Sequence, residues 1–325
     1  MAGDELRFMR VLITGAFGFV GKNLSAELAA RGHRLIALDV AQQVPSAYSE
    51  FLTWADLEHI ERLDADAVIH LAGKAHDVRN ASDSKIYFDI NVGLTKRIAE
   101  RFLASQAKVF IQFSSVKAVA DRVPGEVLTE EETPVPQTAY GASKLEAERH
   151  LQSVGFPAGR RLYILRPCMI HGPGNKGNLN LLFNVVKRGI PWPLGAFENK
   201  RSFASVQNVC AVVAALLEGQ AESGVYQVAD DEALSTNELI GAMAVALGRQ
   251  ARVWNLPAGL VRKAARLGDV LHLPLNSERL KKLTESYVVS NGKIKRALGW
   301  ERMPVEAGEG MRQTLLSFSR NSARP

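Results

Sequence analysis

A tyrosine and a lysine four positions apart are the first pair in the sequence that could do chemistry. Tyr140 and Lys144 lie in YGASK, a segment that predicts the start of a helix, so both side chains are expected on one helix face. An ammonium group there can lower the pKa of the phenol and also reach a ribose, which makes Tyr140 a usable acid–base group near neutral pH. Ser115, 25 residues before Tyr140 at the end of a predicted strand, can hydrogen-bond the same substrate oxygen while the proton moves. The three side chains predict a reaction at an alcohol or ketone carbon.

A tyrosine and a lysine at this spacing also occur by chance, and then the tyrosine is a half-buried packing residue and the lysine a solvated one. Two further features favour the chemical interpretation. Ser115 follows a second serine, Ser114, at the same strand end, and a glycine-rich segment precedes both along the chain. A cofactor-binding segment in front of an acid–base pair is the context that such a site requires.

The glycine-rich segment is GAFGFVG at 15–21, between the apolar run VLIT and the helix-like stretch VGKNLSAELAARG. Glycines at such a junction let the backbone turn sharply, approach a pyrophosphate and pack the helix closely on the sheet, while free helix N–H groups bind the phosphate charge. We therefore expect a dinucleotide here, with an ordinary tight turn as the alternative. The expected contacts in this segment are Gly15, Phe17, Gly18, Phe19, Val20 and Gly21.

An acidic residue favours NAD over NADP as the dinucleotide. Asp39 ends the next strand-like run, 18 residues beyond Gly21, where a carboxylate can accept both hydroxyls of an adenosine ribose and repel a 2′-phosphate. Further expected contacts are Asp56 and Leu57 at the adenine and Leu71, Ala72 and Gly73 at the sheet edge. For Asp56, an ordinary helix cap is an equal alternative.

These groups must be positioned by strands and helices that alternate along the first half of the chain. Short apolar runs rich in β-branched residues predict strands, and amphipathic stretches between them predict helices. Such alternation is typical of a parallel sheet covered on both faces, so the predicted fold class is α/β with a doubly wound sheet. The predicted strands lie at 10–15, 34–39, 67–73, 108–115 and 162–167, and the predicted helices around 19–31, 86–105 and 140–153.

The pattern becomes irregular after the HGPG segment at 171–174. Turn-rich pieces follow, then a helix-like run at 207–218 and a strand-like run at 224–230. Ser235 and Glu238 predict a capping box that opens another helix. We therefore expect 1–174 with 206–230 to form the dinucleotide-binding domain, and 175–205 with 231–325 to form a smaller, mixed α/β substrate-binding lobe.

Composition sets limits on the kind of protein. The 325 residues, 46% of them hydrophobic, can bury one large α/β core or two smaller ones. The two cysteines, Cys168 and Cys210, are too few for a disulfide framework and have no metal-ligand spacing, so we expect no metal and a reducing compartment, the cytoplasm. The N-terminal MAGDELRFMR carries acids before any apolar run, and no stretch approaches the roughly 18 apolar residues of a membrane span. Neither a secreted nor an integral membrane protein is expected.

Basic charge is concentrated in the C-terminal part. Residues 249–325 hold 15 Lys or Arg against 6 Asp or Glu, whereas residues 1–248 hold 25 against 28. Such a bias can serve an anionic ligand, a nucleic acid or an anionic membrane, or can simply be a solvated basic face. Because no DNA- or RNA-binding signature accompanies it, no nucleic-acid partner is expected. The basic amphipathic stretch Leu260–Leu275 leaves a peripheral-membrane contact open, in addition to catalysis.

Several segments resemble the extended short-chain dehydrogenase/reductases, in particular the NAD-dependent nucleotide-sugar epimerase/dehydratase group, over nearly the whole chain. They are TGAFGFVG, VIHLAG, FSSVKA, YGASK and LRPCMIHGPG. The resemblance implies a Rossmann domain that binds NAD, a catalytic triad of Ser115, Tyr140 and Lys144, and a homodimer formed through the helices that carry Asn91 and Tyr140. It also places Asn91, Ser114, Tyr140, Lys144, Pro167 and Cys168 at the cofactor. From the residues alone, Asn91 is a polar residue of an amphipathic helix and Cys168 a small buried thiol, and these alternatives stay open.

The same resemblance implies a nucleotide-diphospho-sugar substrate, such as a UDP-sugar. Asn178 lies in a turn that resembles the diphosphate-contacting turn of the family, Trp192 and Leu194 fall where the nucleotide base is held, and Arg201 matches an arginine that meets the diphosphate. Fork-shaped cations suit two phosphates in a partly buried site. Arg279 is a second candidate, with a solvated helix charge as its alternative. The predicted substrate-binding residues are Lys74, Ser115, Asn178, Trp192, Leu194, Arg201, Arg279 and Tyr287.

The residues after the triad serine bear on the reaction. Dehydratase-type relatives usually carry an Asp-Glu pair there, whereas Val116 and Lys117 follow Ser115 in this chain. Hydride transfer at C4 is then implied, by a 4-epimerase or, as the alternative, by a reductase of a UDP-4-keto-6-deoxy sugar. A catalytically idle NAD-binding sensor is a third interpretation, but it would be expected to lose Tyr140 or Lys144.

Three features bear on the sugar. Segments such as VIHLAGKAH and PLGAFENKRSF resemble a branch of bacterial surface-polysaccharide enzymes that act on UDP-N-acetylhexosamines. Tyr287, however, falls where a bulky tyrosine in hexose 4-epimerases narrows the pocket against N-acetyl groups, which favours a plain UDP-hexose. His171 stands where many relatives carry a tyrosine, and the sequence offers no account of it.

Overall fold

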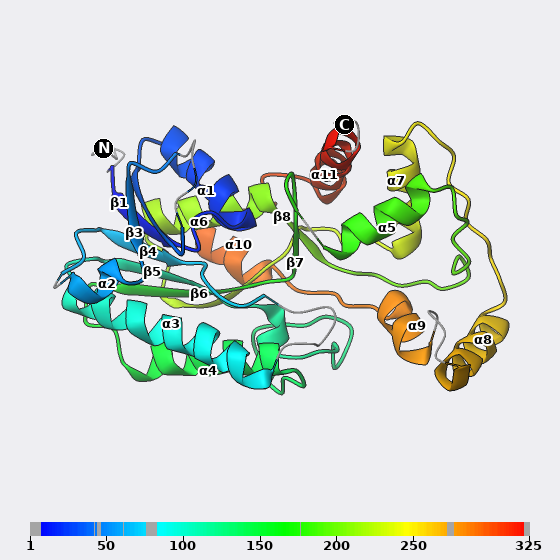
Figure 1. The fold of residues 1–325 in the computed structure, drawn as a ribbon, viewed down its shortest axis with the longest axis horizontal. Coiled ribbons are helices and arrows are strands. Elements are labelled where there is room, and N and C mark those ends of the chain that lie inside the picture. The colour runs from blue at the N-terminus through cyan, green and yellow to red at the C-terminus, as the bar shows by residue number, and fades with distance from the viewer. Residues whose placement is uncertain are drawn as a thin grey trace.

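A parallel sheet of seven strands forms the centre of the protein (Figure 1). The computed structural model describes residues 8–321 except 42, 44–46, 61, 76–82, 176 and 272–275. The strand order is β3-β2-β1-β4-β5-β6-β9. The chain adds β2 and β3 on one side of β1 and the later strands on the other side, so the order of strands reverses between β1 and β4. The strands are β1 (Arg10–Thr14), β2 (Arg34–Asp39), β3 (Glu50–Thr53), β4 (Ala67–His70), β5 (Val109–Phe113), β6 (Arg161–Pro167) and β9 (Gly224–Val228). The predicted doubly wound α/β fold is confirmed.

Helices cover both faces of this sheet (Figure 1). The helices α1 (Phe19–Ala30) and α6 (Val206–Glu218) lie on one face, and α3 (Ser84–Ala104) and α4 (Ala139–Ser153) lie side by side on the other. Because both faces are covered, the central strands are apolar runs that are buried throughout, such as VFIQF in β5. The edge strand β3 is only half-buried and reads EFLT, which explains why the sequence pattern did not predict it.

Most of the remaining elements lie beyond the carboxyl ends of the strands (Figure 1). Two short parallel strands, β7 (Met169–His171) and β8 (Phe203–Ser205), begin this part. The short elements α2 (Asp56–His59), η1 (Val116–Ala118) and α10 (Gly292–Leu298) belong to the large sheet and its loops. The other helices are α5 (Asn178–Lys187), α7 (Thr236–Ala246), α8 (Ala258–Leu271), α9 (Ser277–Thr284) and α11 (Ala307–Asn321). Two apolar clusters of their own hold these helices together, one of α5, α7 and α11 and the other including α8 and α9.

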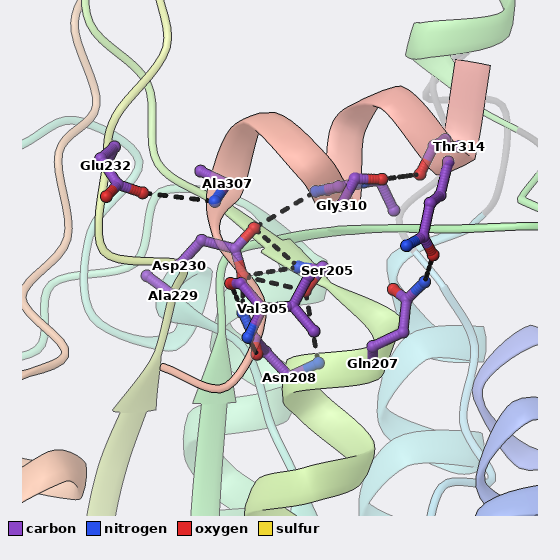
Figure 2. Close-up of polar contacts among 12 residues, drawn as sticks. Ser205, Gln207, Asn208, Ala229, Asp230, Glu232, Val305, Ala307, Gly310 and Thr314 are labelled. Carbon is purple, nitrogen blue, oxygen red and sulfur yellow. Dashed lines mark hydrogen bonds and ion pairs between the residues drawn. The ribbon is translucent and has the colours of Figure 1, made fainter. Parts of the chain in front are cut away.

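A buried polar network joins the large sheet to the C-terminal helix (Figure 2). The Asp230 carboxylate accepts hydrogen bonds from the Ser205 N–H at 2.9 Å and the Asn208 amide at 2.7 Å. His171 is fully buried, with Nε2 3.4 Å from Asp230 and Nδ1 2.9 Å from the Thr314 hydroxyl of α11. His171 therefore links the end of β9 to α11, because each of its two ring nitrogens can form a hydrogen bond with a different partner.

No helix in the described ranges is long and apolar enough to cross a membrane.

Candidate active site

The glycine loop follows β1 at the point where the strand order reverses, which is where ligands bind in sheets of this kind. Gly15 has a φ of +65°, and a Cβ there would lie 2.8 Å from the Ala72 backbone nitrogen. A Cβ on Gly21 would lie 2.4 Å from the Ala16 carbonyl oxygen. Both positions need glycine, the first for its backbone conformation and the second so that α1 can pack against the loop.

Asp39, at the end of β2, holds this loop in place. Its carboxylate accepts hydrogen bonds from the backbone N–H of Phe17 at 2.9 Å and of Val40 at 2.8 Å. The hydroxyl of Tyr48 donates to the carbonyl of Ala16 at 2.9 Å. Asp39 therefore lies against the glycine loop, the location that the prediction of ribose binding requires. Direct contact with a ribose stays a prediction.

Asp56 and Leu57, the predicted adenine contacts, begin the short helix α2. The Asp56 carboxylate accepts hydrogen bonds from the N–H and the hydroxyl of Thr53 at 2.7 and 2.8 Å, and these bonds lower its pKa. Asp56 thus ties the start of α2 to the end of β3, but the N-cap position of α2 is Ala55, and contact of Asp56 with an adenine stays a prediction. The Leu57 side chain is buried in the core, and contact of Leu57 with an adenine stays a prediction.

The three predicted catalytic residues meet at the carboxyl ends of β5 and β6. A hydrogen bond joins the Ser115 and Tyr140 hydroxyls, and the buried Lys144 ammonium group donates to the Phe113 carbonyl at 3.0 Å. Tyr140 is half-buried, with its ring edge-to-face against Tyr87. The structure thus brings together residues from η1, α4 and the end of β5.

Burial shifts the pKa values of both Tyr140 and Lys144. Burial raises the pKa of Tyr140, and the hydrogen bond from Ser115 opposes this effect. Burial also lowers the pKa of Lys144 to about 8, because a charged amine loses hydration in the interior, while Glu148 acts in the opposite direction. The Lys144 ammonium group is directed at the Phe113 carbonyl, and a lowering of the Tyr140 pKa by Lys144 stays a prediction.

Asn91, on α3, fixes the loop after β4. Its side-chain oxygen accepts from the Lys74 N–H at 2.8 Å, and its amide nitrogen donates to the Ser143 hydroxyl at 2.9 Å. A Cβ on Gly73 would lie 2.7 Å from the Asn91 oxygen and 3.1 Å from the Lys144 nitrogen. The loop that carries Leu71, Ala72, Gly73 and Lys74 is therefore tied to the helix that carries Tyr140 and Lys144.

Beneath this loop lies a buried chain of hydrogen bonds that sequence analysis missed. His70 Nδ1 is 2.6 Å from the Thr14 hydroxyl, His70 Nε2 is 3.2 Å from the Thr95 hydroxyl, and Thr14 accepts from the Ala72 N–H at 3.0 Å. Burial and the nearby Lys144 lower the pKa of His70 to about 3, so the ring is neutral. Thr14 and His70, the polar residues that end β1 and β4, were the sequence signal from which these hydrogen bonds could have been predicted.

The Ser114 side chain is directed at α4. Its hydroxyl donates to Glu148, whose carboxylate also forms a buried ion pair with Arg166. Contact between Ser114 and the cofactor stays a prediction. Pro167 ends β6, and the next residue, Cys168, is buried, with its N–H donating to the Val228 carbonyl at 3.1 Å. Burial raises the pKa of the Cys168 thiol, so it is an unreactive neutral group.

Lys117 lies where the acid pair of dehydratases is expected. Its ammonium group is 4.4 Å from the centre of the Tyr287 ring and donates to the Asp121 carbonyl at 3.0 Å. The buried Tyr287 donates its hydroxyl to the Ala120 carbonyl at 2.7 Å. The backbone of Arg201 pairs with that of Tyr287, and burial lowers the pKa of Arg201 and of Lys117. Lys117, two residues after Ser115, thus covers the Tyr287 ring, and Tyr287 in turn pairs with Arg201.

The other predicted substrate residues lie on segments that follow β7 in the chain. Trp192 and Leu194 are buried, and their backbones pair with residues 253–255. The Trp192 Nε1–H has no hydrogen-bond acceptor among the described residues. Asn178 is the first residue of α5, and Arg279 is exposed on α9. Binding of substrate by these four residues stays a prediction.

The residues present fit a dinucleotide. Gly15 and Gly21 leave a close backbone path at the start of α1, Asp39 supplies a carboxylate at the end of the neighbouring strand, and Lys144 is buried beside Gly73. These groups lie along one edge of the sheet on both sides of the reversal point, as an extended cofactor needs.

Comparison with known proteins gives matches along the whole chain. The model of the NAD dependent epimerase/dehydratase family matches residues 11–229. A UDP-glucose 4-epimerase of Vibrio cholerae is 28% identical over 328 residues, covering 97% of this chain and 97% of its own. An N-acetyl-alpha-D-glucosaminyl-diphospho-ditrans,octacis-undecaprenol 4-epimerase of Escherichia coli O157:H7 is 29% identical over 297 residues, covering 88% of this chain and 84% of its own. Among solved structures, the NAD complex of the Thermus thermophilus UDP-glucose 4-epimerase is 26% identical, with a TM-score of 0.72 over 96% of this chain and 99% of that one.

Proposed function

The chain belongs to the NAD-dependent epimerase/dehydratase family, and from this premise we propose that it is a 4-epimerase of a UDP-hexose or UDP-N-acetylhexosamine in surface-polysaccharide precursor synthesis. The observation that carries the proposal is the meeting of Ser115, Tyr140 and Lys144 beside the loop that carries Gly73. This arrangement suits proton transfer at a sugar hydroxyl next to a hydride acceptor.

Each residue has a part in the proposed reaction. Tyr140 removes the proton of the C4 hydroxyl and later returns it, while Ser115 hydrogen-bonds the same oxygen and holds it in place. Lys144, fixed by the Phe113 carbonyl, supplies positive charge beside the loop that carries Gly73. Bound NAD, held by the glycine loop, Asp39 and Lys144, would supply the hydride acceptor and donor for C4.

The neighbourhood of Ser115 supports epimerisation over dehydration. Elimination of a C6 hydroxyl needs a carboxyl pair for acid–base work. Val116 is buried, and Lys117 is held by the Asp121 carbonyl and the Tyr287 ring. A lysine whose pKa burial lowers can carry positive charge but cannot replace the two carboxyl groups.

The position of the Tyr287 ring favours a plain UDP-hexose over an N-acetylated one within this proposal. Its hydroxyl is anchored to Ala120 and its ring is covered by Lys117, so the ring is held in one position. The similar proteins differ in what carries the sugar, since one name specifies a nucleotide and another a polyprenyl lipid. Both carriers are diphosphates, which suits the cationic Arg201, and the nucleotide is the carrier we propose.

The test is to release and identify the bound dinucleotide, then to incubate the enzyme with UDP-glucose, UDP-N-acetylglucosamine and a UDP-4-keto-6-deoxy sugar. The expected result is interconversion of C4 epimers without net change in NADH absorbance. Stoichiometric NADH consumption with the keto sugar alone would establish a reductase and overturn the proposal.

A matched pair of variants tests the catalytic assignment. Tyr140→Phe is expected to keep NAD binding and to lower kcat by about 100- to 10,000-fold, because the acid–base group is lost. Tyr226→Phe makes the same chemical change at a hydroxyl bonded to the Glu222 carbonyl, away from the triad, and is expected to keep normal turnover. A near-normal rate for Tyr140→Phe would show that the acid–base group is elsewhere.

A further inference from the structure

Large exposed apolar side chains gather at α8 and the segment that leads into it. Six residues, here called the α8 patch, are between 41% and 72% exposed. They are Trp254, Leu256, Leu260, Leu267, Val270 and Leu271. Figure 1 shows α8 at one end of the long axis of the molecule, away from the large sheet. Residues 272–275 of the amphipathic stretch lie outside the described residues.

Two rows of apolar residues run along α8, and the fold uses one of them. Val261, Ala265 and Gly268, at positions i, i+4 and i+7, are buried and pack α8 against the lobe. Leu260, Leu267 and Leu271, at positions i, i+7 and i+11, form a second row beside the first. Because the first row is sufficient to seat the helix, the second row remains exposed to solvent in this chain.

Cations border the exposed row. Lys263 and Arg266 lie next to it on the side away from the buried row, and both are exposed. Residues 249–271 contain five Lys or Arg and a single acid, Asp269. The Asp269 carboxylate is held by Ser277, with the Ser277 N–H at 2.9 Å. Leucines with a cationic border and a nearby tryptophan are the composition of a helix that lies in a membrane interface.

We propose that the α8 patch and its cationic border bind peripherally to the surface of an anionic lipid bilayer. Charge complementarity selects this partner over a second copy of the chain. Symmetric pairing of two α8 patches would place Lys263 and Arg266 of one copy against the same cations of the other, whereas acidic headgroups neutralise them. The leucines then enter the boundary between headgroups and acyl chains.

The test is co-sedimentation of the full chain with vesicles of phosphatidylglycerol and phosphatidylcholine, compared with phosphatidylcholine alone. Binding is expected to the anionic vesicles and to weaken at about 1 M salt, where charges are screened within about 3 Å. Leu260→Ser with Leu267→Ser, and separately Lys263→Glu with Arg266→Glu, are each expected to lower the partition coefficient by about tenfold or more.

Matched controls separate the α8 patch from general surface changes. Val245→Ser removes an apolar side chain that is 77% exposed on α7, and Lys108→Glu with Arg188→Glu makes the same charge change at exposed positions outside α8. Both controls should bind vesicles as the unchanged protein does. Since the assay needs no substrate, its result is independent of the proposed epimerase activity.

Three outcomes would overturn the proposal. They are absence of vesicle binding at low salt, binding that neither pair of α8 substitutions weakens, and binding that the controls weaken equally. Gel filtration adds a fourth, in which the unchanged protein is a dimer without affinity for vesicles and Leu260→Ser with Leu267→Ser makes it a monomer. The α8 patch would then be an interface between copies.

Discussion

Lys144 and Tyr140 lie in surroundings that move their pKa values apart. Burial lowers the pKa of the Lys144 ammonium group to about 8 and raises that of the Tyr140 phenol, so the two shifts run in opposite directions and the neutral forms of both groups are favoured. The ammonium form is the one that can stabilise a phenolate, so the charge on Lys144 decides when Tyr140 can act as a base.

The alkaline side of the pH profile follows from the Lys144 pKa. Lys144 is charged below about pH 8 and neutral above it, so kcat/KM is expected to fall as the pH rises through about 8. The measurement is kcat/KM between about pH 6 and 10. Because burial also lowers the pKa of Lys117, Lys117→Met serves as the control and should keep the alkaline fall. Loss of the fall in Lys117→Met would assign it to Lys117.

Tyr287 provides a test of sugar selectivity. Tyr287→Ser removes the ring against which Lys117 lies and is expected to raise kcat/KM for the N-acetylated sugar relative to the plain hexose by about tenfold or more. Tyr287→Phe keeps the ring and loses the bond to Ala120, so it should keep the original ratio. An unchanged ratio in Tyr287→Ser would place the pocket wall elsewhere.

At the scale of elements, one ion pair holds the catalytic helix to the sheet. Glu148 of α4 and Arg166 of β6 are both buried, and Glu148 also accepts from Ser114 at the end of β5. The pair therefore fixes the helix that carries Tyr140 on the strands beneath it.

Breaking this pair should destabilise the protein strongly. Arg166→Met leaves the Glu148 carboxylate buried without its cation and is expected to lower the free energy of unfolding by about 3–5 kcal/mol. Arg166→Met combined with Glu148→Met removes both charges and should recover part of the loss. The measurement is denaturant unfolding of each variant, and a double variant less stable than Arg166→Met would contradict the account.

The elements that the sequence predicted well are those with strong local patterns. The strands β1 and β5 are continuous apolar runs, as buried strands are, and glycines mark the loop that follows β1. The glycine and triad positions fall together because the carboxyl ends of parallel strands share one edge. The tie between Ser114 and Glu148 could not be predicted, since 34 residues separate two polar groups whose pairing depends on the packing of α4. The same reason hid the role of His171.

At the scale of the whole molecule, the His171 network holds the C-terminal helix on the large sheet. The Thr314 hydroxyl is 2.9 Å from His171 Nδ1, and Thr314 is fully buried. Thr314→Val removes this partner with little change of shape and is expected to lower the free energy of unfolding by about 1–3 kcal/mol. Hydrogen exchange should quicken in α11 before it does in α3.

The control for this prediction lies on the same helix. Ser317→Ala removes a hydroxyl that donates to the Thr314 carbonyl at 2.6 Å and leaves the contact with His171 unchanged. Equal loss of protection in α11 for both variants would mean that the helix is held by other contacts.

The same network has a consequence for synthesis on the ribosome. Every strand of the large sheet has been made once residue 228 is added, but Asn208 takes its last backbone partner from Val305, at 2.8 Å, and His171 takes its partner from Thr314. A nascent or prematurely ended chain therefore has the complete sheet with buried polar groups that still lack partners. Such a chain is expected to be a preferred target of chaperones and proteases until α11, the last helix to emerge, supplies the missing partners.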